Sequence, residues 1–137
     1  MLLGGAPTAF FGKTYDEALA LLVEMRDYVA DGEMGDRAGL APALGVRMSC
    51  EALRITARLT QIMAWLLAQK AIHAGEVSTE EVIRRNEKLA GIAICMEEDE
   101  GGDAALLPAR FRALAERSHR LYVRVTRLDE MMRRQVA

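Results

Sequence analysis

The side chains with the clearest capacity for chemistry form a polar row in the middle of the chain. The row leads into the only tryptophan, Trp65, and its members are four or three residues apart, as one face of a helix requires: Arg47, Glu51, Arg54, Arg58 and Gln61. Arginine and tryptophan are enriched in protein interfaces. We therefore expect Glu51, Arg54, Arg58 and Gln61 to bind a protein partner. The alternative is a network inside the chain, in which Glu51 pairs with Arg54 or Arg58.

A second charged set lies near the C-terminus, where arginines repeat at helical spacing. Arginine forms planar, bidentate contacts with carboxylates, so such a stripe can dock an acidic protein partner. A solvated helix face is the other interpretation. A third is nucleic-acid binding, which we keep as the alternative function, although a formal net charge of -2 disfavours general affinity for nucleic acid. The candidate contacts are Arg117, Arg120, Arg124 and Arg127.

The sequence predicts no catalytic residue, no metal site and no cofactor. It holds no glycine-rich phosphate loop and no GxSxG, HExxH or CxxC motif. His73 and His119 fall on different predicted helices, and Cys50 has no obvious base beside it. We therefore expect a protein that is not an enzyme. A ligand pocket near His73 and Trp65 is a further hypothesis.

The elements that must position these residues are helices. The chain has 137 residues, is 51% hydrophobic and only 5% aromatic, and is rich in good helix formers. Capping boxes at Thr14 and Ser78, glycine stops and Pro108 punctuate the pattern. The predicted helices span about 15–31, 46–74, 79–90 (a short one) and 108–134. Residues 31–45 and the acidic stretch 97–103 are expected to be loops.

Apolar stripes at spacings of four and three predict how these helices pack. We expect an all-α fold in one domain, 1–137: a three-helix up-down-up bundle with one possible short extra helix. The segment 62–67 is apolar nearly all round, more than such a bundle easily buries. Its side chains are therefore candidates for packing or for a homodimer interface: Trp65, Leu66 and Leu67.

The sequence offers no targeting or membrane signal. Its start lacks a positively charged region and is broken by glycines and Pro7, and 62–68 is too short to cross a membrane. We therefore expect a cytoplasmic protein without a membrane partner.

Three tracts resemble a known family: FFGKTYDEALALLVEMRDYVA (10–30), SCEALRITARLTQIMAWLLAQKAIHAGE (49–76) and RSHRLYVRVTRLDEMM (117–132). They are similar, in order, to the regulator of CtrA degradation (RcdA) family. The signature tract of that family maps onto Ser49, Glu51, Arg54, Thr56, Arg58, Gln61, Trp65, Gln69 and Lys70.

The resemblance implies a dimeric three-helix bundle that acts as a non-enzymatic adaptor in regulated proteolysis during the bacterial cell cycle. The implied partners are the protease ClpXP, co-adaptors and cargo such as the response regulator CtrA. Family members can carry a flexible extension beyond the last helix, whereas this sequence stops at Ala137. Such an extension is thought to help family members engage the protease or cargo. Without it, we expect protease tethering to be affected more than the binding of cargo or co-adaptors.

Overall fold

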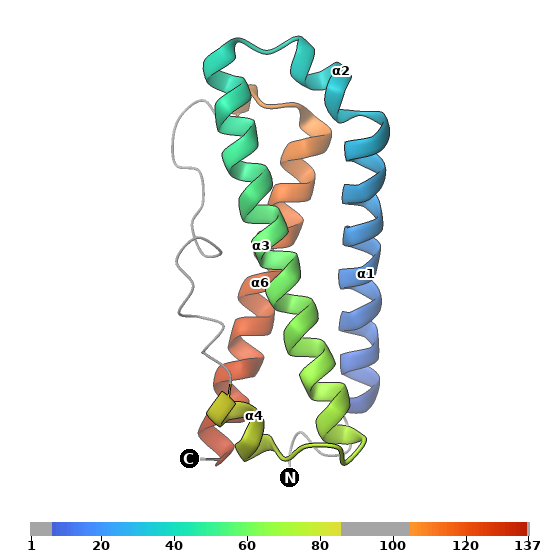
Figure 1. Ribbon diagram of the computed structural model, residues 1–137, viewed down its shortest axis with the longest axis vertical. Helices are drawn as coiled ribbons and strands as arrows, with labels where there is room; N and C mark the ends of the chain where they lie inside the picture. The colour runs from blue at the N-terminus through green and yellow to red at the C-terminus, as the bar shows by residue number, and fades with distance from the viewer. Residues whose placement is uncertain (1–6, 86–104, 137) are drawn as a thin grey trace.

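A computed structural model describes residues 7–85 and 105–136, and within them the fold is all-α. Three long helices lie side by side (Figure 1). Two short helices complete the described part of the chain. In chain order the elements are α1 (Pro7–Asp31), α2 (Glu33–Ala38), α3 (Pro42–His73), α4 (Thr79–Arg85) and α6 (Ala109–Val136).

The first helix begins at Pro7 rather than near residue 15. Thr14, expected to cap the helix, lies inside it and is buried. The physical reason is that the apolar stripe of α1 continues backwards through Phe11, which is seven residues before Ala18 and equally buried in the core. Proline is also well tolerated in a first helical turn.

The glycine-rich stretch after α1 is not only a loop, as the sequence analysis expected. It contains α2, and α3 then begins at Pro42, four residues earlier than expected. The hydroxyl of Tyr28 donates a 2.8 Å hydrogen bond to Asp36, which ties α2 to the end of α1. This contact between the two helices helps to offset the low helix propensity of the glycines.

The C-terminal end of α3 is closed by Gly75, which has a φ of 77°. The amide of Glu76 bonds to the carbonyl of Ala71 and the amide of Gly75 to that of Ile72, both at 3.0 Å. Glycine adopts this left-handed conformation without steric cost, which makes it a common helix stop. Ser78 then caps α4 by accepting a hydrogen bond from the amide of Glu81. The predicted extension of α4 to residue 90 and the acidic stretch 97–103 lie outside the described residues.

The order of helix directions differs from the predicted up-down-up arrangement. Contacts between α3 and α6 advance together along both helices, from Arg58–Ser118 to Trp65–Asp129, so these helices are parallel. Contacts between α1 and α6 run in opposite order, as in Glu17–Arg124, so α1 is antiparallel to both. The prediction was wrong because it assumed short connections between all the long helices.

Helix α4 and the start of α6 lie at opposite ends of the long helices. Helix α4 packs on the C-terminal part of α6, whereas α6 begins at the opposite end, where Arg110 stacks on the ring of Tyr28 (Figure 1). With 28 residues, α6 rises about 42 Å between these ends. Because α6 begins at the end where α3 begins, it runs parallel to α3.

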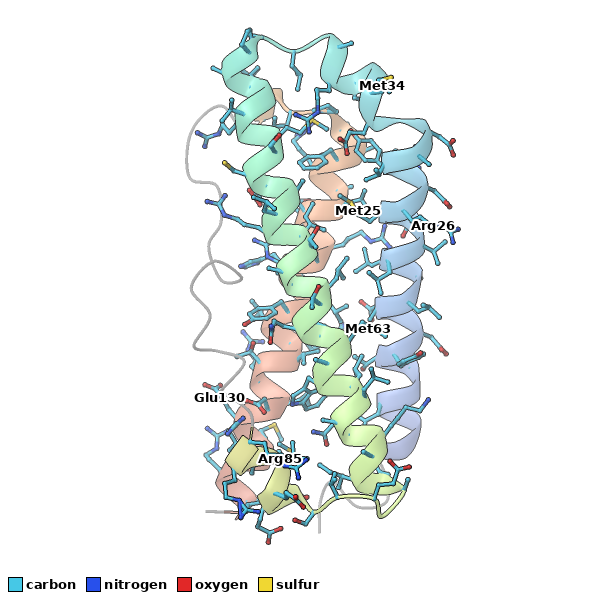
Figure 2. The ribbon with its side chains drawn as sticks, viewed as in Figure 1. Met25, Arg26, Met34, Met63, Arg85 and Glu130 are labelled. Carbon is cyan, nitrogen blue, oxygen red and sulfur yellow. The ribbon has the colours of Figure 1, made fainter. Side chains whose placement is uncertain are left out.

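The core lies between the three long helices, and each contributes one stripe to it. Figure 2 labels Met25 of α1 and Met63 of α3, which pack partly buried against this core. No described helix is long and apolar enough to cross a membrane. The buried stripe of α6 also contains polar residues, and these residues are central to the candidate sites.

Candidate protein-binding surfaces

The first group of predicted site residues forms a buried cluster between α3 and α6, here called the Arg58 cluster. The side chain of Arg58 is 1% exposed, and its Nη1 donates to the carbonyl of Ala115 at 3.2 Å and to Ser118 Oγ at 3.1 Å. The carboxylate of Glu51 accepts a 2.9 Å bond from Arg54 and lies 3.8 Å from Arg58 Nη2. Every charged group of the cluster therefore has a partner within the chain.

The Arg58 cluster changes how the polar row of α3 is understood. The sequence analysis expected this row to face water or a partner, but Glu51 and Arg58 are both buried, and Arg58 bonds to α6. A buried guanidinium is stable only when it is paired and hydrogen-bonded, and these contacts supply both. Arg54 and Gln61 lie half-buried at the edge of the same row. Partner binding by the row stays a prediction, and these two side chains are its accessible members.

A second buried cluster surrounds the single tryptophan and is here called the Trp65 cluster. The indole Nε1 of Trp65 donates to Asp129 Oδ1 at 3.1 Å, and Asp129 Oδ2 accepts a 2.9 Å bond from Arg133. The ring of Phe11 meets the indole edge-on at 5.5 Å between centroids, a favourable aromatic geometry. One turn further along α3, Gln69 Nε2 contacts the sulfur of Met132 at 3.3 Å.

The Trp65 cluster accounts for most of the apolar surface predicted around this tryptophan. Trp65 and Leu66 are buried inside the chain, by Phe11 from the unexpected first turns of α1 and by α6. Leu67 is 54% exposed. The homodimer stays a prediction, but Leu67 is the accessible member of the three candidates.

Sequence reasoning missed Asp129, which is 1% exposed. A signal for it was present in the core stripe of α6. Asp129 follows Val125 by four residues and precedes Met132 by three, so it occupies a core position of the helix. A carboxylate at such a position requires a partner, which Trp65 and Arg133 provide.

The arginine stripe of α6 divides into two kinds of side chain. Arg117 and Arg124 pair with Glu24 and Glu17 of α1, each at 2.5 Å. The hydrogen bond from Arg117 lowers the pKa of Glu24. Arg120 and Arg127 are exposed, and neither forms a hydrogen bond or an ion pair with a described residue. Two of the four candidate arginines, Arg117 and Arg124, thus pair with α1, whereas Arg120 and Arg127 do not.

An open groove of about 480 Å³, here called the α3–α6 groove, adjoins the Arg58 cluster. Apolar and charged side chains share its lining. Within the described residues, no group of three or more His, Cys, Asp or Glu side chains could hold a metal ion. His73, 5.4 Å from the Phe11 ring, is remote from the groove, whereas His119 lines it. The lining residues are Glu51, Arg58, Ala105, Leu107, Phe111, Arg112, Ala115, Glu116, His119 and Arg120.

A further surface, here called the outer row of α3, carries no charge. Its members are spaced three and four residues apart, and all but the half-buried Met63 are exposed. The hydroxyls of Thr56 and Thr60 bond to backbone carbonyls one turn earlier in their own helix, which satisfies their donors. The row therefore presents a largely apolar surface. It consists of Val46, Ser49, Leu53, Thr56, Thr60, Met63 and Leu67.

Comparison with known proteins gives one family. A family model described as "Protein of unknown function (DUF1465)" matches residues 5–137. The crystal structure of RcdA from Caulobacter crescentus CB15 is similar to this chain, with a TM-score of 0.67 and 31% sequence identity, over 90% of this chain and 91% of that one. The chain belongs to the RcdA family. No curated protein sequence matches it.

Membership of the RcdA family confirms the resemblance of the three sequence tracts. In this RcdA-family chain, the signature tract of α3 supplies the α3 side of both buried clusters, through Arg58 and Trp65. Several of the signature residues therefore have a structural role in packing α3 against α6.

Proposed function

We propose that this protein is a non-enzymatic adaptor in regulated proteolysis in the bacterial cytoplasm. The observation that carries the proposal is its similarity to RcdA over 90% of the chain. An adaptor makes or breaks no bond; it binds substrate and protease machinery together and so raises the effective concentration of one near the other. The proposed partners are ClpXP, co-adaptors and response-regulator cargo such as CtrA.

The proposed contacts are the accessible members of the predicted sites. Arg120 and Arg127 of α6 are exposed, and Arg54 and Gln61 lie at the edge of the α3 row. Nucleic-acid binding has less support, because Arg117 and Arg124 form ion pairs with carboxylates of α1. Neutralised arginines contribute little to the phosphate attraction on which such binding depends.

A reconstituted degradation assay tests the adaptor function. Purified ClpXP, CtrA and the co-adaptors are combined with increasing amounts of this protein, and CtrA loss is followed over time. The expected result is faster degradation that falls again at high adaptor concentration, where substrate and protease occupy separate adaptors. The double variant Arg120→Glu, Arg127→Glu should lose stimulation, whereas Arg26→Glu, at an exposed site on α1, should keep it. Absence of stimulation across the whole range contradicts the proposal.

The proposed adaptor is a homodimer that associates through the outer row of α3. From Leu53 to Leu67, over about 21 Å, the row carries no charged side chain, so this part can oppose a second copy of itself across a two-fold axis without repulsion. Sedimentation of the wild type at micromolar concentration should show a dimer, and Leu53→Glu should dissociate it. Leu106→Glu, at an equally exposed leucine outside the row, is the matched control. A wild type that is only monomeric rules the dimer out.

A further inference from the structure

We infer that the α3–α6 groove binds a short extended segment of a protein partner that carries an apolar side chain between two acidic ones. The inference rests on the proposed function only in taking the occupant to be a protein. It assigns a ligand chemistry to this groove. Of the contact residues predicted from the sequence, only Glu51, Arg58 and Arg120 line it.

The inner part of the groove is apolar and preformed. Leu107, which is buried, and Ala115, which is half-buried, line it, whereas Phe111 is 0% exposed and belongs to the core behind them. Behind this floor, the hydrogen bonds of the Arg58 cluster hold α3 and α6 together. A floor fixed in this way can receive an apolar side chain without first rearranging, which limits the entropy that binding costs.

Two arginines on the rim supply the charge. Arg112 and Arg120 both line the groove, and because they lie eight residues apart on α6 they are about 12 Å apart along its axis. Arg112 Nε donates to the carbonyl of Leu107 at 3.0 Å, which anchors this guanidinium beside the floor. Neither arginine has an ion pair with a described residue. Each can therefore receive a carboxylate in a bidentate contact.

The spacing of the two arginines selects the shape of the ligand. In an extended peptide, side chains two residues apart point the same way, and four residues span about 13 Å. A segment with acidic side chains at its first and fifth positions therefore matches Arg112 and Arg120. Glu116 lies between the two arginines on α6, so a third carboxylate at the central position would be repelled. An apolar central residue avoids this repulsion.

Other classes of ligand fit the groove less well. A nucleotide base is usually held by stacking on an aromatic face, but Phe111, the aromatic behind the floor, is 0% exposed. Long nucleic acid would be repelled by Glu116 on the rim. A peptide combines the apolar and acidic groups that the lining requires.

Fluorescence anisotropy with the full chain and labelled five-residue peptides tests the inference. The probe is Glu-Ala-Leu-Ala-Glu, with Gln-Ala-Leu-Ala-Gln and Glu-Ala-Glu-Ala-Glu as comparison peptides. We expect saturable binding of the probe. Gln-Ala-Leu-Ala-Gln lacks both carboxylates and should bind at least about tenfold more weakly, since one charge-assisted contact alone contributes about that factor. Glu-Ala-Glu-Ala-Glu keeps both carboxylates but adds the central one that Glu116 repels, and it should also bind more weakly than the probe. Arg112→Gln and Arg120→Gln should each weaken the probe about tenfold. Arg134→Gln, at an exposed arginine of α6 outside the groove, should bind as wild type does.

Three results would overturn the inference. They are no saturable binding of the probe up to millimolar concentration, equal weakening by Arg134→Gln, and full displacement of the probe by an equal concentration of inorganic phosphate or ATP. The last result would indicate a general anion site. The peptide assay contains no protease or cargo. It therefore tests the groove independently of the degradation assay, and either assay can give a negative result while the other gives a positive one.

Discussion

Helix α6 is attached to its two long neighbours in opposite ways. Toward α3 it presents polar groups that are almost completely buried, such as Ser118 and Asp129. Toward α1 it presents ion pairs in which both partners remain 40–47% exposed, Arg117–Glu24 and Arg124–Glu17. Arg58 of α3, which bonds to Ser118, is buried and has a structural role. Arg117 and Arg124, which face α1, form weaker ion pairs that solvent screens.

The difference shows which contacts can specify the helix register. If α6 slid by one turn along α3, Arg58 would lose Ser118 and Trp65 would lose Asp129, leaving buried polar groups without partners. A similar shift along α1 would only return exposed arginines to water. We infer that the buried clusters fix the parallel pairing of α3 and α6, whereas apolar packing holds α1 in place.

The largest effect is expected from Arg58→Ala, which removes the centre of the Arg58 cluster. The change should lower the free energy of unfolding by about 3–5 kcal/mol, because Glu51 and Ser118 stay buried without this partner. Denaturant unfolding followed by circular dichroism measures the loss. Arg124→Ala is the matched control on the α1 side, with an expected loss of about 0–1 kcal/mol. Equal losses in the two variants would remove the contrast between the interfaces.

A smaller loss, about 1–3 kcal/mol, is expected from Asp129→Ala. The substitution leaves the buried indole N–H of Trp65 without its acceptor. Because Trp65 is the only tryptophan, its fluorescence emission reports this site directly, and the folded variant should show a shifted maximum. Glu130→Ala, at the exposed neighbouring residue labelled in Figure 2, should change neither stability nor emission. A shift caused by both variants would not support the assigned hydrogen bond.

Near the end of α1, Tyr28 donates a hydrogen bond to Asp36, and this contact should make the free energy of unfolding depend on pH in the alkaline range. Burial and the hydrogen bond to Asp36 raise the pKa of Tyr28 above its ordinary value of 10. The protonated phenol thus stabilises the fold fully below about pH 10, and this contribution declines above it by about 1.4 kcal/mol per pH unit. Tyr28→Phe should flatten the decline in unfolding experiments between pH 9 and 11, whereas Tyr15→Phe should leave it unchanged. An unchanged slope in Tyr28→Phe would contradict the assignment.

The smallest effect is expected at the exposed pairs of α1. Glu24→Gln should cost about 0–1 kcal/mol at neutral pH and less at high salt. Because Arg117 lowers the pKa of Glu24 in the folded protein below its usual 4.5, the contribution is present above about pH 4.5 and is lost as the pH falls through the folded value. The difference in unfolding free energy between Glu24→Gln and the wild type should therefore be smaller at pH 3 than at pH 7. A larger difference at pH 3 would reverse the assigned sign.

The helical content and the apolar stripes could be predicted from the sequence because both depend on local periodicity. Gly75, for example, stops α3 where the pattern predicts a stop. The start of α1 was missed because a capping signal at Thr14 is local, whereas the burial of Phe11 depends on its contact with Trp65. The direction of α6 was missed because helix periodicity is the same in both directions.

The residue types of the polar row of α3 could be read from the sequence, but the solvent exposure of its side chains could not. The polar row of α3 looks like a solvent face in the sequence, and only the position of α6 determines that Arg58 is buried. The sequence offered pairing of Glu51 with Arg54 or Arg58 as an alternative, and the structure contains both contacts. The groove rim was missed because Arg112 becomes part of a site only through Leu107 and the adjacent helix.

The central claim is that the buried arginine of the signature tract builds the fold and does not bind a partner. The double variant Glu51→Leu, Arg58→Met tests it most directly, because replacing a buried ion pair by apolar side chains of similar size is often neutral. We predict that it folds with stability within about 1.5 kcal/mol of the wild type and stimulates CtrA degradation as the wild type does. A double variant that is equally stable but does not stimulate degradation would contradict the claim.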